Sequence, residues 1–291
     1  MAHFIAVLSD KITVDDDSWS YTVKNLPRES ETTPKGLIKL ISVTSTATKQ
    51  LIQLSFTKAP TNRATSAELP SKLALISFAD FRLRHIDKLN PEQTIPAPSK
   101  DSTIYIARLL QHGIRINGVT YNFFGHSNSQ LKSRSCFLLA ESKDAIQHKI
   151  DGLGDFKNIK TVAKKAKRIG LLFSSTKCDI VLEPTRCVDI PDIQNQDYNF
   201  TDGCGLISPQ FMQKLVKQTP IIFRNQKYVP SVVQIRYRGY KGVLAIEPSL
   251  AGQVQVQFRE SMKKFTASGD STLSVVDHSK VCFSSFYHVT N

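Results

Sequence analysis

The chain has 291 residues, 41% of them hydrophobic and 22% charged, which is ordinary for a globular protein. It has no run of about 18 apolar residues, which excludes a transmembrane helix, and its N-terminus lacks the basic and long apolar regions of a signal peptide. The 38 lysine and arginine residues against 25 aspartate and glutamate residues give a net charge of +13, which favours nucleic acid or an anionic membrane face as partner, although many basic proteins bind neither.

The cysteines do not form the close pairs that hold zinc. There are five of them, at Cys136, Cys178, Cys187, Cys204 and Cys282, and none lies in a C-x-x-C spacing. An odd number in a chain of this length is typical of a reduced, intracellular protein. We therefore expect a protein of the nucleus or cytoplasm, with no zinc site.

Residues 1–100 are predicted to form a poorly defined mixed N-terminal segment. Within it, residues 26–36 are polar with two prolines and predict a loop, and residues 41–56 are rich in β-branched side chains and predict extended chain. Residues 58–72 and 90–100 are rich in Pro, Ser, Thr and Ala and are typical of connectors. The second connector is the predicted domain boundary.

Residues 101–175 are predicted to form a mixed region of helix and hairpin. The stretch 101–112 opens with an Asp-Ser pair suited to an N-cap and is followed by Gly113, a typical helix end. The stretch 114–124 places two apolar runs around Asn117-Gly118, the dipeptide preferred in two-residue hairpin turns.

The most regular helical pattern spans residues 158–169, with Asn158 as cap and apolar residues on one face. Lysines and an arginine occupy the rest, and no acid lies between Lys157 and Arg168 to relieve their repulsion. The pattern fits either a solvated amphipathic helix or a helix that faces phosphates, and the sequence leaves both open.

Residues 176–280 are predicted to be rich in β-structure. Val233, Ile235 and Tyr237 alternate with polar or basic residues, which is typical of a half-buried strand, and short apolar runs with glycine turns follow. Between residues 221 and 246 there are five basic residues and no acid. The basic face this predicts fits a nucleic-acid backbone or an ordinary solvent-exposed sheet face equally well.

Motifs for other chemistries are missing. The sequence has no phosphate loop of the G-x-x-x-x-G-K-[ST] type, no G-x-S-x-G and no H-E-x-x-H. Asp15 and Asp17 are the only D-x-D pair, and no glycine follows to turn the chain around a metal, so we do not expect a metal site there. Asp202 offers a single carboxylate in a Gly-rich turn, where glycines for tight packing and capping of backbone N–H groups by Asp202 are the expected roles.

Five sequence blocks resemble, in the right order, characteristic blocks of the eukaryotic cellular RNA-dependent RNA polymerases of the RNA-silencing type. They are FFGHSNSQLK (123–132), KRIGLLFS (167–174), IPDI and YNFTDGCGLIS (190–208), PSVVQIRYRGYKGV (230–243) and RESMKKF (259–265). One block would be a weak indication, whereas five in order are specific. Residues 1–100 carry no matching block.

The resemblance implies an α+β fold in which residues 176–280 form part of the first of two double-psi β-barrels, preceded by a mixed α/β segment. It also implies an enzyme that copies single-stranded RNA into double-stranded RNA for RNA silencing, with RNA template and nucleoside triphosphates as partners and other silencing proteins as possible ones. The D-x-D-G-D motif that would hold Mg²⁺ in the second barrel is absent from this sequence. We therefore expect Mg²⁺ ligands in the intact enzyme but not in this chain, and an isolated chain that is inactive.

Residues 281–291 do not resemble the family and are expected to be an atypical tail that marks a truncation. A non-catalytic module that binds single-stranded RNA, or an inactive remnant, therefore stays open as an alternative function.

By motif position, the resemblance implies that Lys241 and Lys264 support catalysis near the triphosphate. Arg236, Arg238 and Lys263 are further candidates for contacts with RNA or nucleotide phosphates. The residues themselves agree, because a lysine in Gly-Tyr-Lys-Gly sits where an unobstructed backbone lets a phosphate approach. A solvated turn lysine is the alternative for Lys241.

Overall fold

The computed structural model describes residues 4–8, 36–45, 50–92, 94–116, 118–223, 225–267 and 271–280. Asp15 and Asp17, nearly all of the predicted loop 26–36, Asn117 and the tail 281–291 lie outside these residues. The chain divides into two compact units. The first unit comprises Met1–Leu153 and Ile159–Ser174, and the second comprises Gly154–Asn158 and Ser175–Asn291.

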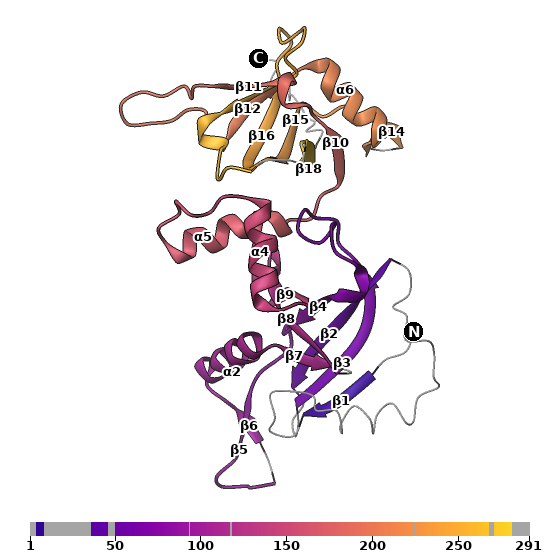
Figure 1. The fold of residues 1–291 in the computed structure, drawn as a ribbon, viewed down its shortest axis with the longest axis vertical. Coiled ribbons are helices and arrows are strands. Elements are labelled where there is room, and N and C mark those ends of the chain that lie inside the picture. Colours follow the sequence, from indigo (N-terminus) through magenta and orange to yellow (C-terminus); the bar gives the residue numbers. More distant parts are fainter. Residues whose placement is uncertain are drawn as a thin grey trace, which may run out of the picture. The chain divides into compact units, whose positions relative to one another are not determined.

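The first unit is built on a seven-stranded sheet (Figure 1). Its spatial order is β1 (Phe4–Leu8), β3 (Gln50–Lys58), β2 (Leu37–Ser45), β4 (Leu73–Ser77), β9 (Ser135–Leu139), β8 (Val119–Gly125) and β7 (Ile114–Ile116). Only β2 and β4 pair in parallel among these neighbours. The extended chain expected over 41–56 is confirmed as parts of β2 and β3.

The predicted domain boundary at residues 90–100 lies inside the first unit. The stretch contains β6 (Thr94–Pro96), which pairs with β5 (Arg84–Ile86), and the start of α2 (Ser99–His112). On either side of it, β4 and β9 are hydrogen-bonded neighbours in one sheet, so residues on both sides share one core. The main division falls instead between Ser174 and Ser175, where the sequence also predicts a change of region.

The helix expected over 101–112 is confirmed, but its start is earlier and its cap is different. α2 follows Pro98, which gives no side-chain cap, and Gly113 ends it with a φ of +80°. Ser102 instead accepts a hydrogen bond from the backbone N–H of Leu83 at 3.0 Å. The hairpin of β7 and β8 is also confirmed, with Gly118 at a φ of +76° in its turn.

The described part of the first unit contains three further α-helices: α3 (Asn128–Lys132), α4 (Lys143–Leu153) and α5 (Val162–Ile169), which continues into the short 3₁₀ turn η2 (Gly170–Phe173). Both α2 and α4 contact β8. α5 begins after Thr161, later than the predicted cap Asn158, and none of its residues is buried. Val162, expected on its packed face, is 86% exposed, so the predicted apolar face is only partly covered within the described chain.

The second unit is built on a mixed seven-stranded sheet (Figure 1). Its spatial order is β10 (Cys178–Val181), β18 (Thr272–His278), β15 (Val232–Tyr237), β16 (Tyr240–Ile246), β12 (Cys204–Ile207), β17 (Val256–Arg259) and β11 (Cys187–Ile190). The second unit also contains four short elements, η3 (Pro184–Arg186), β13 (Ile222–Phe223), β14 (Gln226–Lys227) and η4 (Glu260–Met262). The first unit contains one further short element, η1 (Pro70–Lys72). The α+β class, with a β-rich barrel region after a mixed segment, is confirmed.

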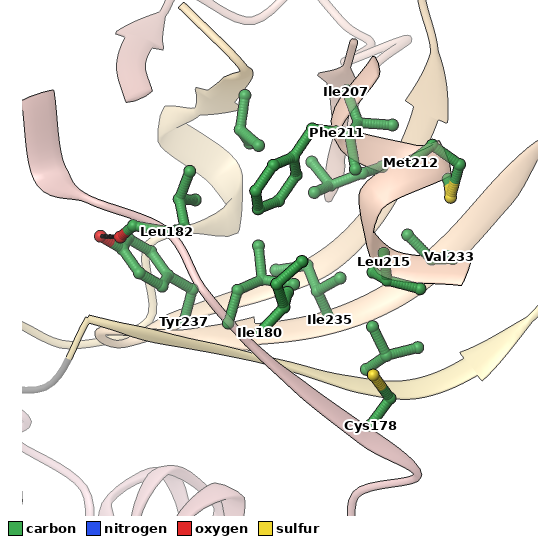
Figure 2. Close-up of a cluster of buried hydrophobic side chains, with 14 of the residues drawn as sticks. Cys178, Ile180, Leu182, Ile207, Phe211, Met212, Leu215, Val233, Ile235 and Tyr237 are labelled. Atoms are coloured by element: carbon green, nitrogen blue, oxygen red, sulfur yellow. Dashed lines mark hydrogen bonds between the residues drawn. The ribbon is translucent and has the colours of Figure 1, made fainter. Parts of the chain in front are cut away.

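One helix, α6 (Pro209–Gln218), closes the core of the second unit. Ser208 caps it by accepting a hydrogen bond from the N–H of Phe211. Figure 2 shows Phe211, Met212 and Leu215 of this helix in one cluster with the side chains of Val233 and Ile235 from β15. This core holds one face of β15 and thereby determines which side chains face outward.

Candidate nucleic-acid interface

The hairpin of β15 and β16 carries the predicted basic residues. Val233, Ile235 and Tyr237 are buried and the residues between them are half-buried, which confirms the predicted alternation. Arg236 lies directly opposite Lys241 in the antiparallel register. Because directly opposed residues project from the same face of a sheet, both cations leave the face away from the core.

A tight turn of two residues joins the strands, since Tyr237 and Tyr240 are paired. Arg238 and Gly239 occupy it with φ values of +40° and +89°, the positive angles of a type I′ turn. A Cβ atom at Gly239 would overlap the carbonyl oxygen of Phe265. Only glycine therefore lets the segment after η4 approach the turn this closely.

This close approach brings Lys263 and Lys264 to the hairpin. Tyr240 and Lys263 form a β-bridge, and the backbone N–H of Lys264 donates to the carbonyl of Gly239 at 2.9 Å. The ammonium of Lys263 lies 5.6 Å from the centre of the Tyr240 ring, and that of Lys264 donates to the carbonyl of Ser261. Segments more than 20 residues apart in sequence are thus joined at one turn.

Arg236 is a largely desolvated candidate cation. One guanidinium nitrogen donates to the carbonyl of Ile235 at 2.7 Å, while Nε is buried with no hydrogen-bond partner in the described chain. Burial lowers the pKa of Arg236 to about 10, which still leaves it charged at neutral pH. Arg236 thus keeps a partly desolvated positive charge directly opposite Lys241, which favours an anion at this face.

Arg238 is placed differently from the other four candidates. Burial raises the pKa values of the Cys187 thiol and the Tyr237 hydroxyl, and the nearby charge of Arg238 opposes both shifts. The positive charge of Arg238 therefore lies close to Cys187 and Tyr237. Lys241, in contrast, lies opposite Arg236 in the strand register. The structure brings the backbone segments that carry Arg236, Lys241, Lys263 and Lys264, called the hairpin cluster below, to one turn, and Arg238 lies in that turn with different side-chain neighbours.

A stack of aromatic rings supports the hairpin cluster, and sequence reasoning missed it. Phe258 stacks on Tyr237 with ring centres 5.3 Å apart and on Tyr240 with centres 4.4 Å apart. The hydroxyl of Tyr240 donates to the carboxylate of Asp189 at 2.7 Å, and burial together with this bond raises the pKa of Tyr240. In the sequence, Tyr237 and Tyr240 on either side of Arg238-Gly239 are the feature that could have indicated this stack.

The Gly-rich turn after residue 200 has the structural role predicted for its glycines. A Cβ at Gly242 would overlap the carbonyl oxygen of Gly203, and one at Gly205 would lie 2.5 Å from that of Gln257. The predicted cap, however, was assigned to the wrong aspartate. Asp202 is exposed, and Asp192 accepts hydrogen bonds from both the N–H and the hydroxyl of Ser261 at 2.9 and 2.7 Å.

Asp192 and Ser261 form a clamp between the loop after β11 and the start of η4. Ser261 also accepts a hydrogen bond from the N–H of Gly203 at 2.9 Å, and Thr201 donates to Asp192 at 3.1 Å. Burial would raise the pKa of Asp192, but hydrogen bonds from Ser261, Thr201 and Asn199 outweigh it and lower that pKa. The clamp positions the segment that leads to Lys263 and Lys264.

The clamp predicts a pH-dependent stability. The pKa of an aspartate in an unfolded chain is about 3.9. When folding lowers this pKa, the carboxylate stabilises the fold at pH values above about 3.9. This stabilisation is lost as the pH falls through the pKa of the folded state. By calorimetry, Asp192→Asn should lower the unfolding temperature of the second unit at about pH 6, and the difference should shrink toward about pH 3. The exposed Asp202→Asn should not do so, and a difference independent of pH would contradict the clamp.

The described residues do not fit a Mg²⁺ site. They contain no group of three His, Cys, Asp or Glu side chains arranged to hold a metal ion. The carboxylate of Asp192 already accepts hydrogen bonds from Ser261 and Thr201, and that of Asp189 accepts one from Tyr240. None of the helices in the described parts of the chain is both long and apolar enough to cross a membrane.

Comparisons with known proteins agree on one family. The sequence model of the family described as "RNA dependent RNA polymerase" matches residues 48–286. "Probable RNA-dependent RNA polymerase 1" of Oryza sativa subsp. japonica is 34% identical over 212 residues, which is 70% of this chain and 28% of that protein. "RNA-dependent RNA polymerase 1" of Schizosaccharomyces pombe is 29% identical, over 96% of this chain and 26% of that protein.

Among solved structures, "RNA dependent RNA polymerase QDE-1 from Thielavia terrestris" superposes with a TM-score of 0.62. The superposition covers 92% of this chain and 30% of the chain in that structure. At 17% sequence identity it shows a likeness of fold. The chain thus spans less than a third of the length of each of these relatives.

Proposed function

Because this chain belongs to the eukaryotic RNA-dependent RNA polymerase family, we propose that its second unit is the first double-psi β-barrel of such an enzyme. In this proposal the hairpin cluster binds phosphates of the template RNA and of the incoming nucleoside triphosphate. The parent enzyme copies single-stranded RNA into double-stranded RNA for silencing, in the nucleus or cytoplasm. The four described cysteines are free, as a reducing compartment requires.

The observation that carries the proposal is the convergence of the hairpin cluster on one turn. Two of its members are cross-strand partners and two arrive from the segment after η4. Lysine ammonium groups are mobile point charges that can follow a phosphate as charge builds up on it. Arg236 adds a fixed and partly desolvated guanidinium with an unpaired donor.

The proposal separates phosphate binding from metal chemistry. Nucleotidyl transfer needs clustered carboxylates for two metal ions, and the described residues do not offer them. Mg²⁺ would then be held by parts of the polymerase that this sequence does not include. A non-catalytic module that binds single-stranded RNA is the alternative, and the same basic cluster supports it.

The test is RNA binding by the whole 291-residue chain across a salt series. A single-stranded contact contributes about 0.7 to the slope of log affinity against log salt. The double variant Lys241→Ala, Lys264→Ala should therefore reduce the slope by about 1.4, together with affinity at low salt. With template, nucleotides and Mg²⁺ added, the wild-type chain alone should incorporate nothing.

A matched control removes two lysines from the same unit. Lys214 and Lys217 are exposed on α6, so Lys214→Ala, Lys217→Ala makes an equal change of net charge outside the hairpin cluster. An equal loss of slope in both double variants would reduce the proposal to non-specific charge. Template-dependent incorporation by the isolated chain would overturn the separation of binding from metal chemistry.

A further inference from the structure

Two adjoining cavities lie in the first unit, whereas the hairpin cluster belongs to the second. The larger has a volume of about 790 Å³ and the smaller about 450 Å³, sizes usual for sites that bind small organic groups. Phe123 and His126 line both cavities. Their ring centres are 6.2 Å apart, so the two rings form a shared wall, called the aromatic wall below.

The larger cavity combines apolar surface with two arginines. Phe78 and Phe81 line it together with Arg82 and Arg134, and Phe81 is held by stacking on Tyr105 at 5.2 Å. Asp80 is the one carboxylate in its lining. Within the described chain neither arginine forms an ion pair with a carboxylate, so both guanidinium groups are available to an anion.

Arg134 occupies a backbone conformation that favours glycine. It follows α3 with a φ of +52°, where residues with a Cβ atom are uncommon. Its position is fixed on both sides, because its N–H donates to the carbonyl of Leu131 and its carbonyl accepts from the N–H of Phe78 at 2.8 Å. This conformation ends α3, and Arg134 lines the larger cavity from that end of the helix.

The smaller cavity has one lysine in its lining and borders a basic helix. It is lined by Lys143 at the start of α4 and by Ala166 and Ile169 of α5. Lys164, Lys165, Lys167 and Arg168 on α5 add cations, and the eight residues of this helix include no acid. The apolar side of α5 is not packed in a core. Through Ala166 and Ile169 it forms part of the wall of the smaller cavity.

We propose that the two cavities bind successive nucleotides of single-stranded RNA, with bases on either side of the aromatic wall. Arg82 and Arg134 contact phosphate at one end and Lys143 and α5 at the other. Aromatic rings accept any base by stacking while basic groups follow the backbone, which is how single strands are held without sequence preference. The proposal goes beyond the hairpin cluster and rests on the proposed function only in taking RNA as the polyanion.

The test uses the whole chain and a single-stranded oligoribonucleotide of about ten nucleotides that carries photoreactive thiouridine. Cross-links should map to peptides of the first unit that contain Phe123 or Arg134. They should persist in the Lys241→Ala, Lys264→Ala variant, so that failure of this site and failure of the hairpin cluster give different results. Cross-links confined to the second unit would overturn the proposal.

Two substitutions remove the proposed contacts without endangering the fold. Arg134→Gly deletes the guanidinium and suits the positive φ, and Phe123→Leu, at a side chain already 39% exposed, removes the stacking surface but keeps an apolar group. Each should weaken binding about tenfold, whereas Lys88→Ala, an exposed cation that lines neither cavity, should change it less than twofold. Unchanged affinity in both Arg134→Gly and Phe123→Leu would contradict the site.

Discussion

Replacement of Gly239 by alanine is expected to destabilise the second unit by about 2–5 kcal/mol. The φ of +89° costs an alanine about 1–2 kcal/mol, and overlap of its Cβ with the Phe265 carbonyl adds the cost of overpacking, about 1–3 kcal/mol. The overlap cannot relax easily, because the Lys264 N–H bonds the Gly239 carbonyl on the same segment. Native-state hydrogen exchange of peptides from β15 and β16 would measure the loss.

Gly252→Ala is the matched control for this change. Gly252 has a φ of +90°, and a Cβ there would meet nothing within 4 Å, so only the backbone cost of about 1–2 kcal/mol remains. The difference between the two variants isolates the contact between the turn and Phe265. Equal losses of protection would show that this contact does not hold Lys263 and Lys264 at the hairpin.

Features set by neighbouring residues could be predicted from the sequence. The alternation of Val233, Ile235 and Tyr237, the hairpin around Gly118 and the end of α2 at Gly113 all depend on side-chain period and turn chemistry within a few residues. The five candidate cations came from the sequence blocks that resemble the family, and the backbone brings all five to one turn, with Arg238 inside it.

Features set by distant partners could not be predicted. Residues 90–100 have the composition of a linker, yet the pairing of β4 with β9 encloses them in one unit. Asp202 is exposed and Asp192 is half-buried, and both lie in polar loops. Only the position of Ser261, 69 residues from Asp192, decides which of the two is a cap. Pairings at such separations leave no local periodicity in the sequence.

Phe258→Ala is expected to be the second severe substitution, with a loss of about 3–5 kcal/mol in the second unit. Phe258 is 1% exposed and stacks on both tyrosines that flank the turn. Its removal leaves a cavity beneath the hairpin, so the register of Arg236 against Lys241 should loosen. RNA affinity should fall with the stability although no cation has been removed.

Phe137→Ala distinguishes a local from a global effect. Phe137 is also 1% exposed, but it stacks on Phe173 in the first unit. Since each unit has its own cluster of buried side chains, each variant should lower hydrogen-exchange protection only in peptides of its own unit. If Phe258→Ala lowered protection equally in both units, the chain would unfold as one cooperative block, and its loss of RNA binding could no longer be assigned to the hairpin cluster.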